Sequence, residues 1–276
     1  MNYGVVMRTD VDLDLISDLA CEAETSGWDG FFIWDGFLGP NPWILLASVA
    51  ARTEGLRFGV MLTAATVRRP WQLASETATL DRLSKGRLIL SLGLGAASDL
   101  GFDRVGEQMD RKIRAELLDE SLDILNGLWT GKPLHYEGKH YQVRDAALSV
   151  TPVQQPRIPV WVVGAWPRMK SMRRVLRCDG LIPSKLTATG VSDNITPEDL
   201  REMFAFVKER LGDPSFDITV EGETPGDDKE KAAQIISPFI DAGATWWLES
   251  IAATPYRLGG IEGVRARIAQ GPPRPD

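Results

Sequence analysis

The chain has few of the residues that metal sites and charge-relay hydrolases need. Two histidines and two cysteines occur among its 276 residues. His135 and His140 fall in one short stretch, whereas Cys21 and Cys178 lie far apart, so no zinc, disulfide or Ser-His-Asp pattern emerges. We therefore predict free, inert thiols in a reducing compartment and no bound metal.

Long apolar runs and an excess of positive charge are also missing. No apolar stretch approaches the roughly 20 residues that a membrane-spanning helix needs, and the first residues lack the pattern of a signal peptide. The formal net charge of −7 argues against general binding to nucleic-acid phosphates. We expect a cytoplasmic protein that binds neither membranes nor nucleic acids. Arg68-Arg69 and Arg173-Arg174 are kept only as candidate anion contacts.

The chain does contain a regular alternation of short apolar runs with longer stretches of helical period. This pattern is typical of βα units around a parallel sheet. Eight units and no mid-chain linker favour one α/β domain that spans residues 1–276 and forms a closed (βα)₈ TIM barrel. Two small domains or an open doubly wound sheet are the less favoured alternatives. The expected strands are residues 3–8, 30–35, 56–64, 87–93, 159–165, 180–185, 216–221 and 244–249.

Two segments depart from this alternation. Within residues 131–158, two alternating stretches flank a turn that contains Gly138, which predicts a β-hairpin inserted between the fourth and fifth barrel strands. Residues 271–276 are rich in proline and cannot continue a helix, so we expect a surface strap or a disordered end there.

The active site of such a barrel lies at the carboxyl ends of its strands. After the fourth strand, Gly93, Gly95 and Ala96 form too short a motif for a dinucleotide fingerprint. Residues without side-chain bulk nevertheless let a planar ring approach the backbone. After the fifth strand, main-chain N–H groups lead toward a helix and can accept an anion, although a plain βα turn is an equal alternative. The residues of that segment are Gly164, Ala165, Trp166 and Pro167.

Tryptophans and acidic residues also fall near strand ends. The chain has nine tryptophans, and Trp34, Trp43 and Trp71 could wall an apolar pocket for an aromatic cofactor or for the substrate. The acids reveal no partner, so a two-carboxylate hydrolase stays an unsupported alternative. These acids are Asp35, Glu221, Glu223 and Glu249.

Residues 58–141 resemble the luciferase-like monooxygenases and their coenzyme F420-dependent relatives. Five linked segments occur in family order, and weaker similarity covers residues 27–53 and 158–182. The segments are Arg68-Arg69-Pro70-Trp71-Gln72-Leu73-Ala74, Leu80-Asp81-Arg82-Leu83-Ser84-Lys85-Gly86-Arg87 running into Gly93-Leu94-Gly95, Leu118-Asp119-Glu120, Leu128-Trp129-Thr130-Gly131, and Tyr136-Glu137-Gly138-Lys139-His140-Tyr141.

The resemblance implies a flavin or deazaflavin ring over the barrel mouth, beside the third strand. The family often has a non-prolyl cis peptide there, which would fall between Met61 and Leu62 and is rare elsewhere. Met61, Leu62 and Thr63 are therefore expected to contact the ring. The phosphate-bearing chain is expected over residues 93–96 and 164–167.

Two departures from the family pattern affect the predicted chemistry. Many members have Asp-His at the end of the second strand, where this chain has Asp35 and Gly36. Sugar-oxidising deazaflavin enzymes have a glutamate directly after the Gly-x-Gly, where this chain has Ala96. Both differences disfavour an alcohol dehydrogenase of that subtype.

We therefore predict a two-component monooxygenase that uses reduced FMN from a separate reductase, oxygen and a small organic substrate. Asp35, followed by Thr63, is the candidate for a catalytic polar contact, and either residue could instead be structural. The alternatives are a coenzyme F420-dependent hydride-transfer enzyme and a non-catalytic flavin-binding member of the fold. The resemblance also implies a homodimer.

Overall fold

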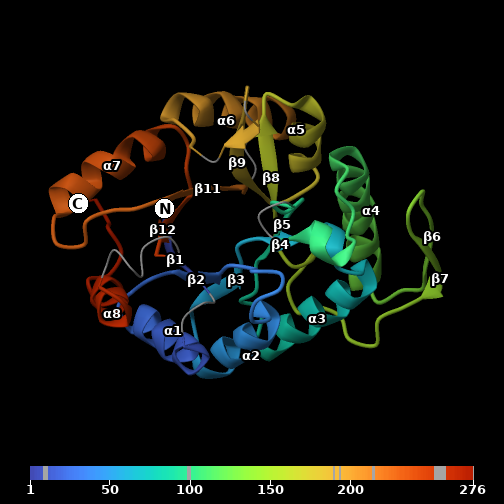
Figure 1. Ribbon diagram of the computed structural model, residues 1–276, viewed down its shortest axis with the longest axis horizontal. Helices are drawn as coiled ribbons and strands as arrows, with labels where there is room; N and C mark the ends of the chain where they lie inside the picture. Colours follow the sequence, from blue (N-terminus) through green and yellow to red (C-terminus); the bar gives the residue numbers. More distant parts are fainter. Residues whose placement is uncertain are drawn as a thin grey trace.

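The backbone forms a ring of strands inside a ring of helices (Figure 1). A computed structural model describes residues 1–8, 12–97, 101–188, 190–192, 194–212, 215–251 and 259–275. The strands of the ring are β1 (Asn2–Met7), β2 (Gly30–Ile33), β3 (Arg57–Val60), β4 (Thr63–Ala64), β5 (Leu90–Gly93), β8 (Val160–Trp166), β9 (Gly180–Thr187), β11 (Asp217–Gly222) and β12 (Trp246–Ser250).

These strands pair in parallel in the order β3-β2-β1-β12-β11-β9-β8-β5-β4. β3 and β4 are two parts of one barrel strand, separated by a cis peptide bond between Met61 and Leu62. A parallel bridge between Phe58 and Leu88, together with the β4–β5 pairing, closes the ring. The predicted (βα)₈ barrel and the predicted cis peptide are both confirmed.

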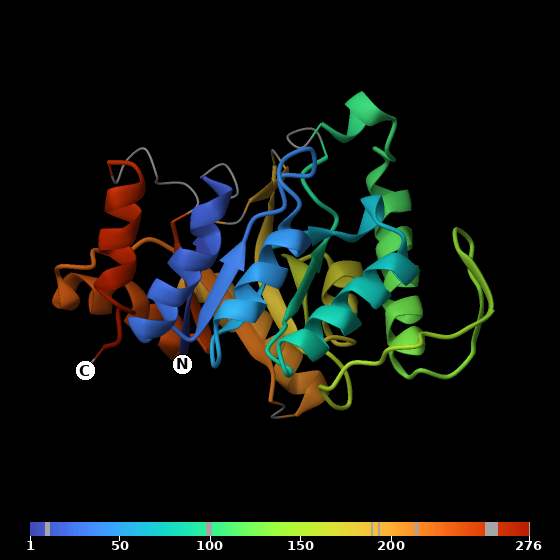
Figure 2. The same ribbon diagram turned by 90° about the horizontal axis from the view of Figure 1, so that it is seen from below.

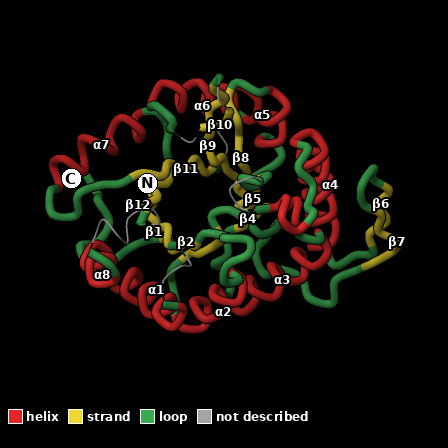
Figure 3. The backbone as a smooth tube through the Cα atoms, in the orientation of Figure 1, coloured by secondary structure: helices red, strands yellow, loops and turns green. Residues whose placement is uncertain are grey.

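The helices cover the outside of the barrel (Figure 3). Their starts follow ordinary capping chemistry: Asn41 caps the helix that begins at Pro42, and Thr196 and Asp199 form a capping box. No described helix is both long and apolar enough to cross a bilayer. The helices are α1 (Ile16–Thr25), α2 (Pro42–Arg52), α3 (Pro70–Leu83), α4 (Arg111–Trp129), α5 (Met169–Val175), α6 (Pro197–Leu211), α7 (Lys229–Asp241) and α8 (Ile261–Ala269).

Short elements occupy the connections between these strands and helices. Three 3₁₀ turns precede α1, α3 and α4, and β10 pairs antiparallel with β9. They are η1 (Leu13–Leu15), η2 (Ala65–Val67), η3 (Phe102–Val105) and β10 (Gly190–Ser192).

Alternation along the strands decides which side chains face the barrel interior. In β12, Trp246 and Leu248 pack in a cluster with Phe32 and Trp161, whereas Trp247 packs in the outer core between strands and helices. The first cluster draws on strands around the whole ring, so it fills the barrel interior, as expected for a barrel of this size.

The amino end of the barrel is filled by aromatic rings around Asp217. The carboxylate accepts hydrogen bonds from the indole N–H groups of Trp161 and Trp246, at 3.0 and 3.1 Å. The ring centroid of Trp161 lies 5.4 Å from that of Phe32 and 5.3 Å from that of Trp246. Buried indole N–H groups need such hydrogen-bond partners, and Asp217 supplies them. Because the aromatic rings fill this end of the barrel, we look for the site at the carboxyl end.

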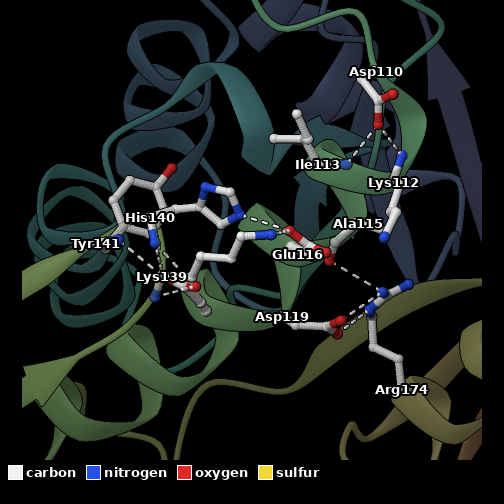
Figure 4. A network of polar contacts seen from close by, with 11 residues as sticks. Asp110, Lys112, Ile113, Ala115, Glu116, Asp119, Lys139, His140, Tyr141 and Arg174 are labelled. Atoms are coloured by element: carbon white, nitrogen blue, oxygen red, sulfur yellow. Dashed lines mark hydrogen bonds and ion pairs between the residues drawn. The ribbon is translucent and has the colours of Figure 1, made fainter.

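The predicted hairpin forms β6 (Leu134–Glu137) and β7 (Gln142–Ala146). It stands outside α4, away from the barrel (Figures 1 and 2). The Glu120 carboxylate accepts the backbone N–H groups of Lys139, His140 and Tyr141 at 2.9 to 3.2 Å. One turn earlier, Glu116 accepts from Lys139 Nζ at 2.7 Å and lies 2.9 Å from His140 Nε2 (Figure 4). Two carboxylates of α4 thus hold the hairpin turn.

In the described part of the tail, residues 271–275, Pro273 is buried and Arg274 is exposed. The Arg274 guanidinium contacts Asp29 at 3.2 Å, and it lies 5.6 Å from the ring centroid of Tyr3. The tail is therefore held against the start of β1 and the turn before β2.

Lowering the pH should weaken the hairpin anchor. Hydrogen bonds from Lys139 and His140 lower the pKa of Glu116 from its ordinary 4.5 to about 2. A carboxyl with a depressed pKa stabilises the folded form above its unfolded pKa, and this stabilisation is lost as pH falls toward the folded value. In hydrogen exchange, we expect the protection factors of the amides of residues 139–141 to be higher than in Glu116→Gln above pH 5.

The two proteins should converge as the pH falls from about 4.5 toward 2. Amides of β12 serve as the control, because the substitution should leave their protection unchanged. A difference at residues 139–141 that stays constant down to the acid limit of folding would contradict the account.

Candidate active site

A cavity of about 670 Å³ opens at the carboxyl end of the barrel strands. Its volume falls in the range of small-molecule sites, roughly 300–1,000 Å³. Much of the apolar part of its wall comes from β8, β9, β12 and the junction of β3 with β4, and includes Met61, Leu62, Val163, Ile182 and Leu248. The cavity therefore offers an apolar surface to a flat or hydrophobic ligand.

Gly93 and Gly95, at the end of β5, line one wall of this cavity. A Cβ atom on Gly93 would lie 2.8 Å from Cδ1 of Leu62. Gly95 has φ of +75°, and a Cβ there would lie 2.8 Å from Cβ of Ala64. A side chain at position 95 would be strained by its backbone as well as by contact. The backbone at Gly93 therefore forms a cradle that a side chain would fill, whereas Gly95 is required by its φ and by its packing against Ala64.

Arg114 of α4 forms the cationic part of the wall. The residue is 5% exposed, and its Nη2 donates to the carbonyl oxygens of Leu94 and Gly95. Its guanidinium also lies 5.4 Å from the ring centroid of Phe102. Among the described residues no carboxylate pairs with Arg114, and its Nε has no hydrogen-bond partner. A buried cation of this kind calls for an anionic ligand.

The neighbouring arginines strengthen the positive charge. Burial lowers the pKa of Arg114, and the adjacent Arg111 lowers it further. Burial also lowers the pKa of Arg111, with a smaller contribution from Arg168. Arg174, which is 7% exposed in its side chain, differs because Asp119 pairs with it at 2.6 Å (Figure 4). Arg111 and Arg114 are therefore the cations that this wall offers to a ligand.

The end of β2 contributes Trp34 and Asp35 to the cavity. Asp35 Oδ2 pairs with the Arg68 guanidinium at 3.0 Å, and Oδ1 accepts the backbone N–H of Phe37 at 3.0 Å. The guanidinium of Arg8 lies 5.7 Å from the ring centroid of Trp34. The Asp35 charge is thus compensated, although the residue borders the cavity as predicted.

The opposite side of the barrel contributes a polar strip along β11. Thr219 and Glu221 line the cavity, and the Thr219 hydroxyl donates to Leu181 O at 3.2 Å. The Ser250 hydroxyl donates to Glu221 Oε1 at 2.7 Å. An acceptor carboxylate therefore stands at the mouth, fixed by a serine of the adjacent strand.

The structure brings together eight of the residues that the sequence placed at the site. They come from the ends of β2, β5 and β8 and from the cis peptide, as expected because the active sites of such barrels lie at the carboxyl ends of the strands. They are Trp34, Asp35, Met61, Leu62, Gly93, Gly95, Ala96 and Ala165.

Other predicted site residues lie behind the wall of this cavity. Thr63 is fully buried, and its hydroxyl has no hydrogen-bond partner among the described residues. Gly164 faces away from the cavity, since a Cβ there would lie 2.4 Å from Leu181 and 3.0 Å from Val175. Its small size therefore serves the packing of α5 on β8, while Val163 and Ala165 face the cavity.

Three tryptophans and a proline also take places away from the cavity wall. Trp166 donates its indole N–H to Glu202 at 2.8 Å, and a cis peptide joins it to Pro167. Trp43 is 7% exposed within the α2 packing. Trp71 packs edge-on against Tyr141, with ring centroids 6.0 Å apart, and so supports the hairpin.

The sequence did not predict Arg111 and Arg114 as site residues, because arginines on helices usually lie in solvent. Arg114 nevertheless lies on the same helical face as Leu118 and Leu125, both buried. A charge on an apolar face is the signal that could have identified it. Each of the two Arg-Arg dipeptides in the sequence contributes one arginine to an ion pair: Arg68 pairs with Asp35, and Arg174 pairs with Asp119.

Comparisons with known proteins agree with this arrangement. A family model described as luciferase-like monooxygenase matches residues 1–268, almost the whole chain. A coenzyme F420-dependent tetrahydromethanopterin reductase from Methanopyrus kandleri has 18% sequence identity and a TM-score of 0.76, with 98% of this chain and 96% of that chain covered.

Two further solved structures are equally similar in fold. An F420-dependent secondary alcohol dehydrogenase has 16% identity and a TM-score of 0.78, covering 100% of this chain and 99% of that one. The monooxygenase RslO1 from Streptomyces bottropensis has 16% identity and a TM-score of 0.76, covering 97% and 96%. At these identities the similarity shows a shared fold.

The two glycines at the end of β5 should respond differently to substitution. Gly95→Ala places a Cβ at positive φ and against Ala64, so we expect a loss of about 1–3 kcal/mol in the free energy of unfolding. Gly93→Ala meets the flexible end of Leu62 at 2.8 Å and Cγ2 of Val163 at 3.1 Å, without the positive φ of Gly95, so we expect a smaller loss, below about 1 kcal/mol. Urea unfolding measures both, and equal effects of the two substitutions would contradict the geometry.

Proposed function

We propose that this chain, which belongs to the luciferase-like monooxygenase family, is a flavin-dependent oxidoreductase that uses reduced FMN and oxygen on a small organic substrate. The observation that carries the proposal is the buried Arg114 guanidinium, which has no carboxylate partner among the described residues and lines a largely apolar cavity. The combination suits a ligand with a flat apolar ring and an anionic chain.

The residues present fit such a ligand. Met61, Leu62 and the backbone at Gly93 would hold the ring, because they offer an apolar surface and room that a Cβ would occupy. Arg111 and Arg114 would hold a phosphate, since guanidinium groups bind phosphate with strong charge-assisted hydrogen bonds. An anion there would also compensate the buried charge.

When bound, reduced FMN would supply the two electrons for a reaction in which one oxygen atom of O₂ enters the substrate and the other leaves, with two protons, as water. The protein would orient the two partners and exclude water. Trp34 and Leu248 would form apolar walls around the reacting groups. Asp35 is proposed as a polar contact that its ion pair with Arg68 holds in place. A separate reductase would supply the reduced flavin.

Coenzyme F420 is the second candidate, and a specific feature favours it. Basic residues continue beyond the cavity along α5, where Arg168 precedes the first helical residue and Lys170 and Arg173 follow. A deazaflavin chain with several negative charges would match this longer basic surface. Titration with FMN and F420 in parallel separates the two, and binding of F420 alone would overturn the FMN proposal.

Removing the Arg114 charge should weaken binding of FMN but not of riboflavin, which has the same ring without the phosphate. For Arg114→Met we expect the Kd of FMN to rise about 10- to 100-fold, since a hydrogen bond to a charged group contributes about 1.5–3 kcal/mol. The Kd of riboflavin should change less than about threefold. Quenching of tryptophan fluorescence measures both values.

The matched control is Arg201→Gln, which should leave both affinities unchanged. Arg201 is an exposed arginine of α6 that lies 3.8 Å from Glu198. An equal loss of FMN and riboflavin affinity in Arg114→Met would show that the residue supports the fold of the cavity rather than the phosphate. Tight FMN binding without oxygen consumption, once the flavin is reduced, would favour the non-catalytic member of the fold.

A further inference from the structure

We infer that Phe102 is a positioning residue for the anion site: its buried ring holds the Arg114 guanidinium in the orientation that binds the phosphate of the cofactor. Phe37, from the loop after β2, supports this ring in turn. The inference rests on the proposed function, because it takes Arg114 as a phosphate ligand. It is carried by one buried ring that lies against both the guanidinium and the backbone to which the guanidinium is bonded.

The short helix η3 directs the ring of Phe102 into the protein. Gly101 and Gly106 flank η3 with φ of +73° and +76°, a conformation that glycine adopts without strain. The Phe102 N–H donates to the carbonyl oxygen of Ala97 at 3.0 Å, and its side chain is fully buried. The three residues that follow it in η3 are exposed. The turn therefore buries one ring and leaves its other side chains at the surface.

The ring contacts the cation and the anchor of that cation together. The Arg114 guanidinium carbon lies 5.4 Å from the ring centroid, within the range of a cation–π interaction. Arg114 Nη2 donates to the carbonyl oxygens of Leu94 and Gly95. A Cβ atom on Gly95 would lie 2.9 Å from Phe102 Cζ, so the ring packs on the backbone that accepts these hydrogen bonds. A guanidinium that turned away would lose both kinds of contact.

This arrangement orients Arg114 without competing with a phosphate. An aromatic ring attracts a cation through its face and takes up no conventional hydrogen bond, whereas a phosphate binds to the N–H groups. Arginine has several rotatable bonds, and ordering such a side chain on binding costs affinity. Because the guanidinium is already held in the free protein, less of that cost remains when the anion binds.

Phe37 holds the ring of Phe102 from the end of β2. The two ring centroids lie 4.7 Å apart with an interplanar angle of 65°, an edge-to-face arrangement. Phe37 has φ of +55°, which residues other than glycine adopt rarely. Asp35 Oδ1 accepts the Phe37 N–H at 3.0 Å and closes this turn. Strained backbone of this kind persists where its surroundings hold it and is common at binding sites.

Binding of FMN and riboflavin to Phe102→Leu tests the inference. Leucine keeps the position apolar but removes the ring. We expect the Kd of FMN to rise about 3- to 10-fold, which corresponds to ordering one long side chain on binding. The Kd of riboflavin should change less than about twofold. Quenching of tryptophan fluorescence measures both, and an equal loss for the two ligands would overturn the inference.

The same substitution in the Arg114→Met background separates positioning from general support of the cavity. If Phe102 acts through Arg114, Phe102→Leu should change the Kd of FMN less than about twofold once the guanidinium is gone, because the two residues are coupled. A loss of the same size in both backgrounds would contradict the inference.

Phe206→Leu is the matched control. Phe206 of α6 is 8% exposed, its ring lies 3.8 Å from the Arg210 guanidinium carbon, and its centroid lies 6.0 Å from that of Trp166. It thus has an arginine and an aromatic neighbour, as Phe102 has, but it does not line the cavity. Phe206→Leu should leave the affinities for FMN and riboflavin within about twofold of the parent values.

Phe37→Leu is the second variant and decides the matter if Phe102→Leu does not fold. Phe37 is only partly buried, and leucine tolerates its positive φ no worse than phenylalanine does. We expect the Kd of FMN to rise about threefold, since the ring of Phe102 remains but is less firmly held. This loss should also disappear in the Arg114→Met background. Unchanged FMN affinity in both the Phe102 and the Phe37 variants would overturn the inference.

The two proposals fail in different ways. Normal FMN binding that is independent of Phe102 removes the inference and leaves the proposed function. If the parent protein binds no FMN, calorimetric titration of the flavin-free protein with inorganic pyrophosphate takes its place. A pyrophosphate affinity that depends on both Phe102 and Arg114 then removes the proposed function and leaves the positioning role, and absence of pyrophosphate binding removes both.

Discussion

The cost of burying the Arg114 charge is the constraint around which the cavity is organised. Its Nη2 reaches only the carbonyl oxygens of Leu94 and Gly95, and no carboxylate in the described ranges compensates it. Carbonyl dipoles offset only part of the desolvation of a guanidinium. The fold therefore keeps a cation in a state that a bound anion would stabilise, which is typical of a binding site rather than of a structural core.

Helix α4 connects this cation to the rest of the molecule. The same helix presents Asp119 to Arg174 on the cavity side and Glu116 to the hairpin on its outer side (Figure 4). Arg174 comes from α5, so α4 fixes the neighbouring βα unit as well as its own loop. The hairpin thus supports the helix that carries Arg114. Such support matters because a binding geometry depends on the residues behind it as much as on those that touch the ligand.

Local patterns and the family resemblance together were enough to predict the barrel, the hairpin and eight of the 26 residues that line the cavity. Alternation of apolar runs gave the strands, and the family resemblance located the cis peptide at Met61 and Leu62. The sequence could not predict which of these side chains face the cavity, because consecutive residues of a strand point to opposite sides of the sheet. Gly164 and Ala165 are adjacent, yet only Ala165 faces the cavity. Arg114 and the Ser250–Glu221 pair depend on contacts between distant elements, which no local pattern reveals.

The central claim is that the α4 side of the cavity binds the phosphate of a flavin-type cofactor. A crystal structure of the protein grown with FMN tests it most directly. The account predicts the phosphate within hydrogen-bond distance, about 2.7–3.2 Å, of the Arg114 or Arg111 guanidinium, with the ring against Met61, Leu62 and Gly93. A phosphate held elsewhere, or a ring bound outside the cavity, would contradict it.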